Sequence, residues 1–309
     1  MAKLVIKIDS KKIEFFDNIV LSTQINSIAS SFSFDTFYDI QTYEFAKIET
    51  FRDDVLIFTG KVFSKTVPSG VSPEPFTYKC NSLTGVLEDC TLPLDAYPIQ
   101  TANKTLLEIV NNICSYFDIT VKIDSSATSD VNGFYTLQDQ SPEKKAADII
   151  NDLCSQKNLI LTHNSRGELI ITKKIAGNNP KVPQHIKLNK SYNYRKFYAE
   201  YNVLGQQSAT DDTTKQATST FSTIDSTRSI TKIQKDGDSS STQENADSLK
   251  YNSYTANTLS IEFHDFFANT GDIFIINNVK TICNAMNYNY NSRGETCSLN
   301  LLNYKIYDR

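Results

Sequence analysis

The chain has 309 residues and a mass of 34.8 kDa, which allows two or three domains of ordinary size. Its 31 Lys and Arg and 35 Asp and Glu give a formal net charge of −4, which argues against a dedicated duplex nucleic-acid binder because phosphate contacts need basic side chains. With only 10 glycines and no Trp, Gly-rich nucleotide-binding loops have little support, and the composition favours a soluble, β-rich protein over a catalyst.

Residues 1–99 are predicted to form an antiparallel β domain. The segment Ser31–Asp35 alternates apolar and polar residues, as a half-buried strand does. Turn-forming residues around Pro68 and Pro73 separate two further extended segments. We expect this region to be a barrel or a sandwich. Its predicted strands are Leu4–Ile8, Ile13–Phe16, Ser31–Asp35, Val55–Val62 and Phe76–Cys80.

Residues 100–178 are predicted to form a small α+β unit. Thr105 and Glu108 have the spacing of a capping box, and the apolar stripe from Leu106 to Phe117 has the period of an amphipathic helix. A strand is expected at Ile119–Ile123.

A second helix of this unit is expected to open at Ser141, a good N-cap followed by proline. Its apolar stripe runs from Ala146 to Leu153. After it, Leu159–Thr162 and Leu169–Thr172 flank a turn at Asn164–Gly167 and predict a hairpin.

Residues 179–309 are predicted to return to β structure. Tyr192–Leu204 reads as an extended segment with five aromatic residues, and residues 208–242 contain 17 Ser or Thr in 35, a composition typical of disorder. Apolar residues recur inside that tract, so we expect it to order within an assembly. A short helix is predicted at Gln243–Tyr254, and the later predicted strands are Leu259–Phe263, Asp272–Ile276 and Cys297–Leu301.

The two outer regions share a sequence echo. The apolar strand Asp54–Phe58 precedes Cys80 by nearly the same interval as Asp272–Ile276 precedes Cys297. This echo predicts that the two outer regions are copies of one β-barrel plan.

The six cysteines give no metal or disulfide signal. No two form a CxxC pair, so a structural zinc site has no support. Cys114 and Cys154 fall on the apolar faces of the predicted helices, and buried free thiols are the expectation. Neither a signal-peptide pattern nor an apolar run of membrane-span length is present, so we expect a soluble protein made in a reducing cytoplasm, without membrane insertion.

The sequence predicts no catalytic, cofactor-binding or metal site. His163, His185 and His264 share no local spacing with each other or with a ligand pattern. Ser141 and Lys144 have the SxxK spacing of a serine acylase, but the helix N-cap explains the serine without chemistry. Asp236–Asp238 begins like a calcium loop and lacks its later ligands, and the acceptor patterns at Asn103 and Asn189 need secretion to matter.

Several segments carry a resemblance to a known family. They are the strand Phe58–Val62 with its central Gly60, the segment Ser82–Thr91, the helix and strand of Thr105–Val121, the stretch Phe134–Lys173, and the helix, strand and loop of Gln243–Ile276. Together these segments resemble the Mu-type phage baseplate hub proteins, relatives of the T4-type central hub. The chain departs from the family where Trp and Gly are usual, since Asn, Phe and Tyr stand there.

The resemblance implies a mainly β fold in which two tail-tube-like β-barrel domains, residues 1–99 and 179–309, flank the α+β insert of residues 100–178. It also implies a non-enzymatic structural role. Three copies would present six barrels in a ring and join a hexameric tail tube to a trimeric central spike. Tape-measure and baseplate wedge proteins would be further neighbours, and DNA would be only cargo passing through the channel. The resemblance places the chain in the tail baseplate of a virion, assembled in the host cytoplasm.

Two other interpretations remain open. The same fold could serve at the tip of a non-contractile tail, as the hub-like N-terminal part of a tail-associated lysin. A carbohydrate-binding or carbohydrate-hydrolysing β protein is the third, although aromatic platforms of Trp and locally paired carboxylates are missing.

Overall fold

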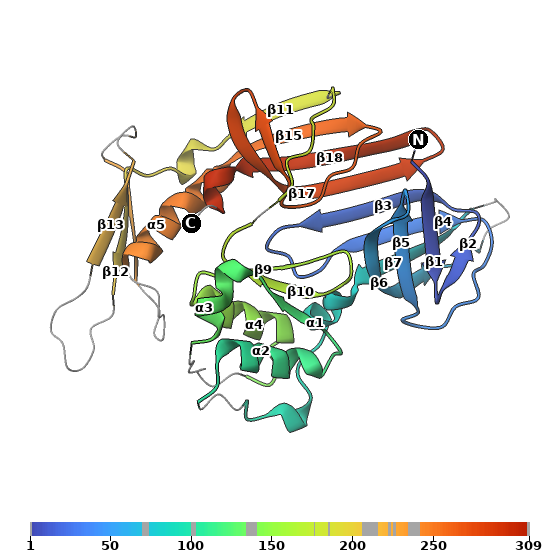
Figure 1. The fold of residues 1–309 in the computed structure, drawn as a ribbon, viewed down its shortest axis with the longest axis horizontal. Coiled ribbons are helices and arrows are strands. Elements are labelled where there is room, and N and C mark those ends of the chain that lie inside the picture. The colour runs from blue at the N-terminus through green and yellow to red at the C-terminus, as the bar shows by residue number, and fades with distance from the viewer. Residues whose placement is uncertain are drawn as a thin grey trace.

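The computed structural model describes residues 2–69, 74–99, 103–133, 141–175, 177–184, 186–205, 216–221, 224, 227–233 and 242–307. Figure 1 shows a large sheet, a helix-rich unit below it, and a small sheet with one helix at the left. The predicted Asp236–Asp238 turn and most of the Ser/Thr-rich tract lie outside the described residues.

Twelve strands from both ends of the chain form one large sheet in which every pairing is antiparallel. They are β1 (Leu4–Ile8), β2 (Lys11–Ile13), β3 (Asp17–Gln24), β4 (Ser31–Thr36), β5 (Lys47–Arg52), β6 (Val55–Thr66), β7 (Phe76–Ser82), β11 (Lys187–Tyr192), β15 (Asn257–His264), β16 (Ile273–Ile276), β17 (Val279–Asn291) and β18 (Gly294–Asn303). Each of the five strands predicted in residues 1–99 overlaps with one of these strands. The overlap is smallest for the predicted strand Ile13–Phe16, because β2 ends at Ile13 and Glu14–Phe16 follow it outside the sheet.

The order of the strands is linear. It runs β11-β15-β18-β17-β3-β4-β7-β6-β5-β1-β2, and β16 pairs with β17 beside this path. The mainly β class is therefore confirmed, and the short α-helices lie in the segments between the strands of this sheet. Two closed barrels are not found: among the described residues, β1–β7 of the first outer region and β11 and β15–β18 of the second join through β3 and β17 into one open sheet.

The two outer regions repeat one topology. In the first, the sheet order is β3-β4-β7-β6-β5, and in the second it is β11-β15-β18-β17-β16. Numbered along the chain within each set, both orders read first, second, fifth, fourth, third. We call these five-stranded sets unit 1 and unit 2.

A β-bulge aligns the two units. In unit 1 the pairing of β6 with β7 shifts between Val62 and Ser64, and in unit 2 the pairing of β17 with β18 shifts between Cys283 and Ala285. When the two bulges are aligned, the strand pairings on either side assign each buried residue of unit 1 to a buried residue of unit 2. The corresponding residues are Val62 and Cys283, Cys80 and Leu301, Tyr78 and Leu299, and Phe34 and Ile261, all at most 5% exposed.

The sequence echo predicted that the two outer regions repeat one plan, and their strand order does repeat. The residues that the echo matched to each other are not the equivalent ones. The register places Leu301 and not Cys297 opposite the bulge in the position of Cys80. Likewise β6 corresponds to β17, whereas the echo matched Asp54–Phe58 of β6 with β16. The repeat is therefore one of topology and burial, not of residue identity.

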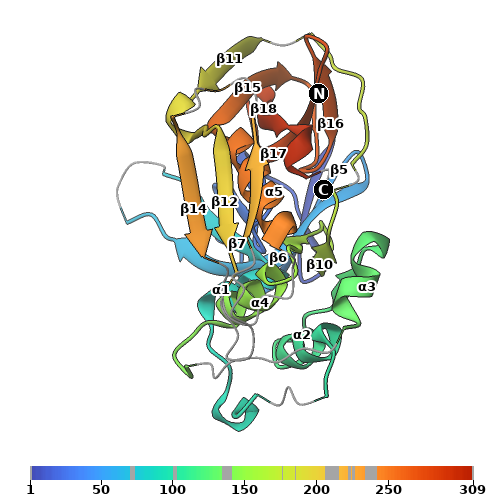
Figure 2. The same ribbon diagram turned by 90° about the vertical axis from the view of Figure 1, so that its left-hand side faces the viewer.

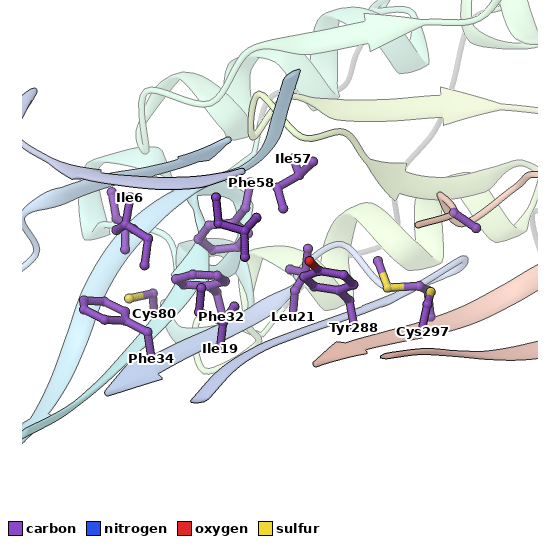
Figure 3. Packing of buried hydrophobic residues seen from close by; sticks show 14 of the residues in the cluster. Ile6, Ile19, Leu21, Phe32, Phe34, Ile57, Phe58, Cys80, Tyr288 and Cys297 are labelled. Atoms are coloured by element: carbon purple, nitrogen blue, oxygen red, sulfur yellow. The ribbon is translucent and has the colours of Figure 1, made fainter. Parts of the chain in front are cut away.

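One face of the large sheet carries the main core. Rows of buried side chains run straight across neighbouring strands, for example Cys297, Tyr288, Leu21, Phe32 and Cys80. Figure 3 shows Ile6 of β1 on the opposite side of this core, so the first strands curl over it. Full burial of each large apolar side chain contributes about 1.5–3 kcal/mol.

The inserted unit has its own core. It contains α1 (Val86–Asp89), α2 (Leu106–Ser115), β8 (Val121–Ile123), α3 (Thr128–Val131), α4 (Ala146–Ser155), β9 (Ile160–His163) and β10 (Leu169–Thr172). The predicted capping box is confirmed: Thr105 Oγ1 accepts from Glu108 N, and the Glu108 carboxylate accepts from Thr105 N. The predicted hairpin pairs β9 with β10, and β8 joins β10 in parallel.

The second predicted helix starts later than its sequence indicates. Ser141 caps a turn, in which its hydroxyl accepts from Glu143 N and its carbonyl accepts from Lys144 N. The helix α4 begins at Ala146 with Lys145 at the N-cap position. A bridge between Thr91 and Lys145 holds residue 145 extended and so delays the helix.

A third sheet stands apart at the left of Figure 1. It consists of β12 (Glu200–Leu204), β13 (Gln216–Thr220) and β14 (Ser229–Ile233), and α5 (Thr242–Asn252) packs against it. Figure 2 views this sheet from its own side. The predicted helix at Gln243–Tyr254 is thus confirmed, whereas a 3-10 turn at Tyr194–Lys196 interrupts the extended segment expected at Tyr192–Leu204.

Candidate functional site

A cavity of about 690 Å³ lies where the inserted unit meets the large sheet. Strands β3 and β6 line it from unit 1, β9 and β10 from the inserted unit, and the loop before β16 from unit 2. Polar side chains line this cavity as well, among them Ser30, Arg52 and His163.

His163 holds the inserted unit to unit 1. Its Nδ1 lies 2.9 Å from the Ser27 carbonyl oxygen, and its Nε2 contacts the Ser30 hydroxyl. Ser30 N in turn donates to Ser82 Oγ at 3.0 Å. Burial lowers the pKa of His163 below its ordinary 6.5, which favours a neutral ring with Nδ1–H donating and Nε2 accepting.

A serine–histidine pair with a third group orienting the ring is also the arrangement of an activated nucleophile. Ser30, however, is 4% exposed, and its backbone is bonded in both directions to Ser82. The contacts fit a structural joint between the β3–β4 turn and β9. Of the other histidines, His264 is exposed at the end of β15, and His185 lies outside the described residues.

A buried ion pair joins the two outer units across the same cavity. Arg52 on β5 donates from Nη2 to Glu295 Oε1 at 2.6 Å and from Nε to Glu295 Oε2 at 3.2 Å. Glu295 on β18 is 1% exposed and also accepts from the Tyr288 hydroxyl. Burial and this carboxylate raise the pKa of Tyr288. Two hydrogen-bonded partners are what a buried carboxylate needs to remain charged.

The connector into unit 2 is held by Asp272 and two glycines. Asp272 accepts from Asn178 N at 3.3 Å and from Asn269 N at 2.8 Å, and burial raises the pKa of its carboxyl. A Cβ on Gly177 would lie 1.8 Å from the Gly271 carbonyl oxygen. Residue 177 therefore has to be glycine for the connector to pass this loop.

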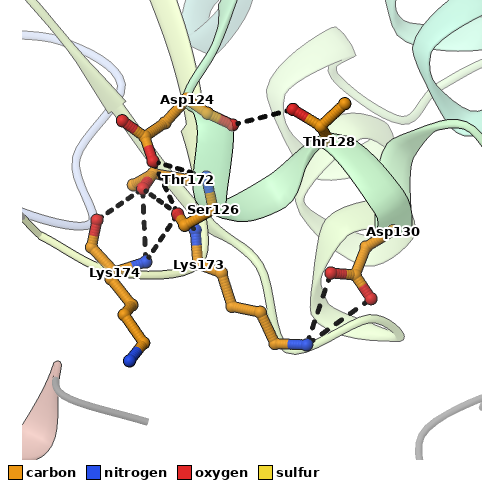
Figure 4. A network of polar contacts seen from close by, with 7 residues as sticks. All are labelled: Asp124, Ser126, Thr128, Asp130, Thr172, Lys173 and Lys174. Carbon is orange, nitrogen blue, oxygen red and sulfur yellow. Dashed lines mark hydrogen bonds and ion pairs between the residues drawn. The ribbon is translucent and has the colours of Figure 1, made fainter.

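A polar network fixes β8 to β10 within the inserted unit. Asp124 accepts from the Ser126 backbone and hydroxyl, and Ser126 Oγ accepts from Lys173 N and from Lys174 N. Figure 4 shows these bonds converging, with the Lys173 ammonium reaching Asp130. The hydrogen bonds from Ser126 lower the pKa of Asp124. All partners belong to one unit, so the network is structural.

The remaining sequence candidates that lie within the described part of the chain do not assemble into catalytic groups. The Lys144 ammonium pairs with Asp152 and not with Ser141. Burial raises the pKa of Cys114, Cys154 and Cys297 to about 12, so these thiols are inert at neutral pH. Within the described residues, no cluster of three or more His, Cys, Asp or Glu could hold a metal ion, and no helix is long and apolar enough to span a membrane.

The face of the large sheet opposite the main core has a different character, which the sequence did not reveal. Its central row runs across β18, β17, β3, β4 and β7 as Ser298, Asn287, Ser22, Ser31 and Asn81. All five are at least partly exposed. The rows on either side add Asn300, Ala285 and Gln24, and Thr296, Asn289, Val20 and Ser33.

This surface, called here the polar face, has no charged side chain on β18, β17, β3 or β4 over the rows just named. A groove of about 490 Å³ follows it. An ordinary exposed surface has about a quarter to a third charged residues, and a protein interface is rich in aromatics and Arg. The polar face has neither composition.

Comparisons with known proteins bear on the whole chain. Residues 84–173 match the family model described as "Baseplate hub protein gp44-like, second domain". The predicted resemblance to baseplate hub proteins is confirmed. The match covers the inserted unit and the preceding turn, and no curated protein matches the chain in sequence.

Solved structures extend the likeness from this domain to the full fold. A 43 kDa tail protein of prophage MuSo2 from Shewanella oneidensis covers 99% of this chain with 99% of its own, at a TM-score of 0.79 and 15% identity. A tail protein from Neisseria meningitidis gives 0.77 at 12% identity, covering 99% and 98%. An Escherichia coli component of the type VI secretion system gives 0.57 at 8% identity, covering 97% and 76%. At these identities the likeness shows the fold alone: the chain has the overall architecture of these tail and secretion-system proteins.

Proposed function

We propose that this chain is the structural, non-enzymatic hub of a contractile phage tail baseplate or a related injection system. It forms a homotrimer that joins the hexameric tail tube to the trimeric central spike and lines the channel between them. Residues 1–99 and 179–309 supply the two tube-like domains, and residues 100–178 form the domain between them. Tape-measure and wedge proteins are its further neighbours in the baseplate of the virion.

The observation that carries this proposal is the repeat of one five-stranded topology in units 1 and 2. A chain with two equivalent β units presents six of them when three copies assemble, so a trimer can meet a six-fold tube with near-equivalent contacts. The hub-domain match at residues 84–173 and the full-length fold likeness to tail proteins point the same way.

The polar face supports the channel-lining role. DNA passing through a channel has to slide without being held, and each Lys or Arg contact to a phosphate adds affinity through counterion release. Small neutral side chains such as Ser22, Asn287 and Ser298 keep the surface hydrated and avoid such contacts. We therefore assign the polar face to the channel wall.

The trimer is tested by light scattering on the purified full chain together with negative-stain imaging. A mass of three chains and a three-fold ring with a central opening are expected. A monomer at all accessible concentrations, unchanged by a spike protein encoded beside it, would remove the proposal.

The channel assignment is tested by spin labels. In the trimer, labels on Asn287→Cys should give a shorter distance between copies than labels on Lys12→Cys, which lies on the exposed side of β2 across the core. The reverse order would place the polar face outside the ring.

A further inference from the structure

The two units of one chain are joined by a pair of strands, and the equivalent strands at the other ends of the two units do not pair with each other in the described residues. Strand β17 of unit 2 pairs with β3 of unit 1 through residues 285–290 and 19–24. This pairing begins just after the bulge of β17, beyond the stretch at 279–282 where β16 pairs with the same strand. After the bulge, β17 is thus free to take its partner from the other unit.

The strands equivalent to β17 and β3 are β6 and β11, and each has an open edge. On the β5 side, the last backbone bonds of β6 are Phe45 N to Val62 O and Val62 N to Ala46 O. From Ser64 onward, β6 pairs only with β7 among the described residues. Among the described residues, strand β11 pairs only with β15, so the outer edge of β11 is open as well.

The internal repeat fixes the register in which these two edges would meet. The bulge makes Lys65 equivalent to Met286, and Tyr192 of β11 is equivalent to Thr23 of β3. Since Met286 lies opposite Thr23, Lys65 of one chain should lie opposite Tyr192 of another. In the same register Thr66 meets Ser191, and Val67 meets Lys190.

The side chains suit this pairing on both faces. Thr66 and Ser191 lie on the side that continues the polar face, and both are small and neutral. On the other side, Val67 and Tyr192 are 58% and 54% exposed in the single chain and would become diagonal neighbours. The Lys65 ammonium already pairs with Asp39 in the single chain, so the opposite Tyr192 ring would contact the aliphatic part of the Lys65 side chain. Pro68 has no N–H and would end the ladder.

We infer that the copies of this chain assemble by pairing β11 of one chain antiparallel with residues 64–67 of β6 in the next. This inference rests on the proposed trimer and specifies its interface. The contact between chains repeats the β17–β3 contact within a chain, so both kinds of junction in the ring are alike. The occupant of the β11 edge is a second copy, because the open β6 edge of this chain offers the register that the β17–β3 pairing sets.

Cysteine cross-linking tests the register. In a Cys90→Ser background, Lys65→Cys with Tyr192→Cys should form disulfides between chains on mild oxidation, because side chains directly opposite lie within disulfide reach. Bands up to the trimer are expected on non-reducing gels. The matched control is Lys65→Cys with Ser191→Cys, which puts the two thiols on opposite faces of the sheet and should give at most one-tenth of the product.

A second variant removes the contact without cross-linking. Tyr192→Asp should convert the trimer to monomer by light scattering with an unchanged circular dichroism spectrum, whereas Phe15→Asp, at an exposed aromatic residue near β2, should leave the trimer intact. A trimer that survives Tyr192→Asp and gives no preference for the 65–192 pair overturns the inference and leaves the proposed function standing. A wild-type chain that never trimerises overturns both.

Discussion

Units 1 and 2 share a topology and differ in how their first strand is used. In unit 1 the outer edge of β3 is covered by β17, and Leu21 and Ile19 of β3 are fully buried. In unit 2 the equivalent strand, β11, has no such cover among the residues that the structure describes, and five of its six residues are exposed. The position of Leu21 is therefore apolar where a partner strand is present in the chain and is occupied by Lys190 where that strand is absent, whereas the position of Ile19 stays apolar as Leu188. In these two strands, the burial pattern depends on whether a partner strand covers the outer edge.

A second difference lies between the strands themselves. Gly60 of β6 and Thr281 of β17 occupy equivalent positions two residues before the bulge. A Cβ on Gly60 would lie 2.1 Å from the Asn81 carbonyl oxygen, while Thr281 is accommodated and donates from its hydroxyl to the Phe274 carbonyl oxygen. The Gly60 in the hub-like sequence segment is thus a packing requirement of unit 1 alone.

The largest expected effect comes from breaking the ion pair between the units. Glu295→Ala leaves the Arg52 guanidinium and the Tyr288 hydroxyl without their shared partner, and should lower the free energy of unfolding by about 3–5 kcal/mol in urea titrations. Glu49→Ala, on the same strand as Arg52 but in a surface pair with Lys47, should cost less than about 1 kcal/mol. Equal losses would mean that the units do not depend on this pair.

Gly60→Ala should destabilise the chain by about 1–3 kcal/mol, because β6 and β7 have to move apart to admit the methyl group. The measurement is the urea midpoint at constant m-value. Gly133→Ala is the control, since its Cβ would meet nothing closer than 3.5 Å. If Gly60→Ala behaves like the control, the proposed asymmetry between β6 and β17 is wrong.

The joint at His163 should respond to pH. Because burial lowers the folded-state pKa of His163, the unfolded chain takes up this proton first as the pH falls through about 6.5. Stability should therefore decrease below that pH, by at most about 1.4 kcal/mol per pH unit from this group. His163→Gln should flatten this part of the melting-temperature profile between pH 7 and 5, and an unchanged profile would refute the assignment.

The smallest effect is local to the inserted unit. Thr105→Ala removes the hydroxyl that caps α2 and should cost about 1 kcal/mol. Ser141→Ala should cost less, because Ser141 caps a turn and not α4. Thermal melts of the two variants compare them directly, and a larger loss for Ser141→Ala would contradict the position of the helix start.

The inserted unit was the most predictable part because its signals are local. The capping box at Thr105 and the turn at Asn164–Gly167 each lie within a few residues, and the structure places both as expected. The start of α4 was wrong because a distant bridge to Thr91 decides it. Strand β17 was missed because Asn287 and Asn289 on the polar face make it look like a loop.

The functional surfaces could not be read from the sequence for a related reason. The polar face gathers residues from Val20 to Asn300, and only the strand registers bring them into rows. The repeat was partly visible, since apolar strands recur, but Tyr78 with Leu299 and Cys80 with Leu301 share only apolar character. The fold class can still be predicted when one apolar residue replaces another. Assigning which residue of one unit corresponds to which residue of the other requires the strand registers of the structure.

The β3–β17 pairing also sets an order of events during synthesis. Residues 19–24 are translated long before their partners at 285–290. The edge of β3 therefore stays open until β17 has been translated, and contacts of such long sequence separation form slowly. A nascent chain could capture the wrong edge during that interval. Truncation shortly before β17 should consequently yield aggregated product, because the outer edge of β3 then has no partner strand in the chain.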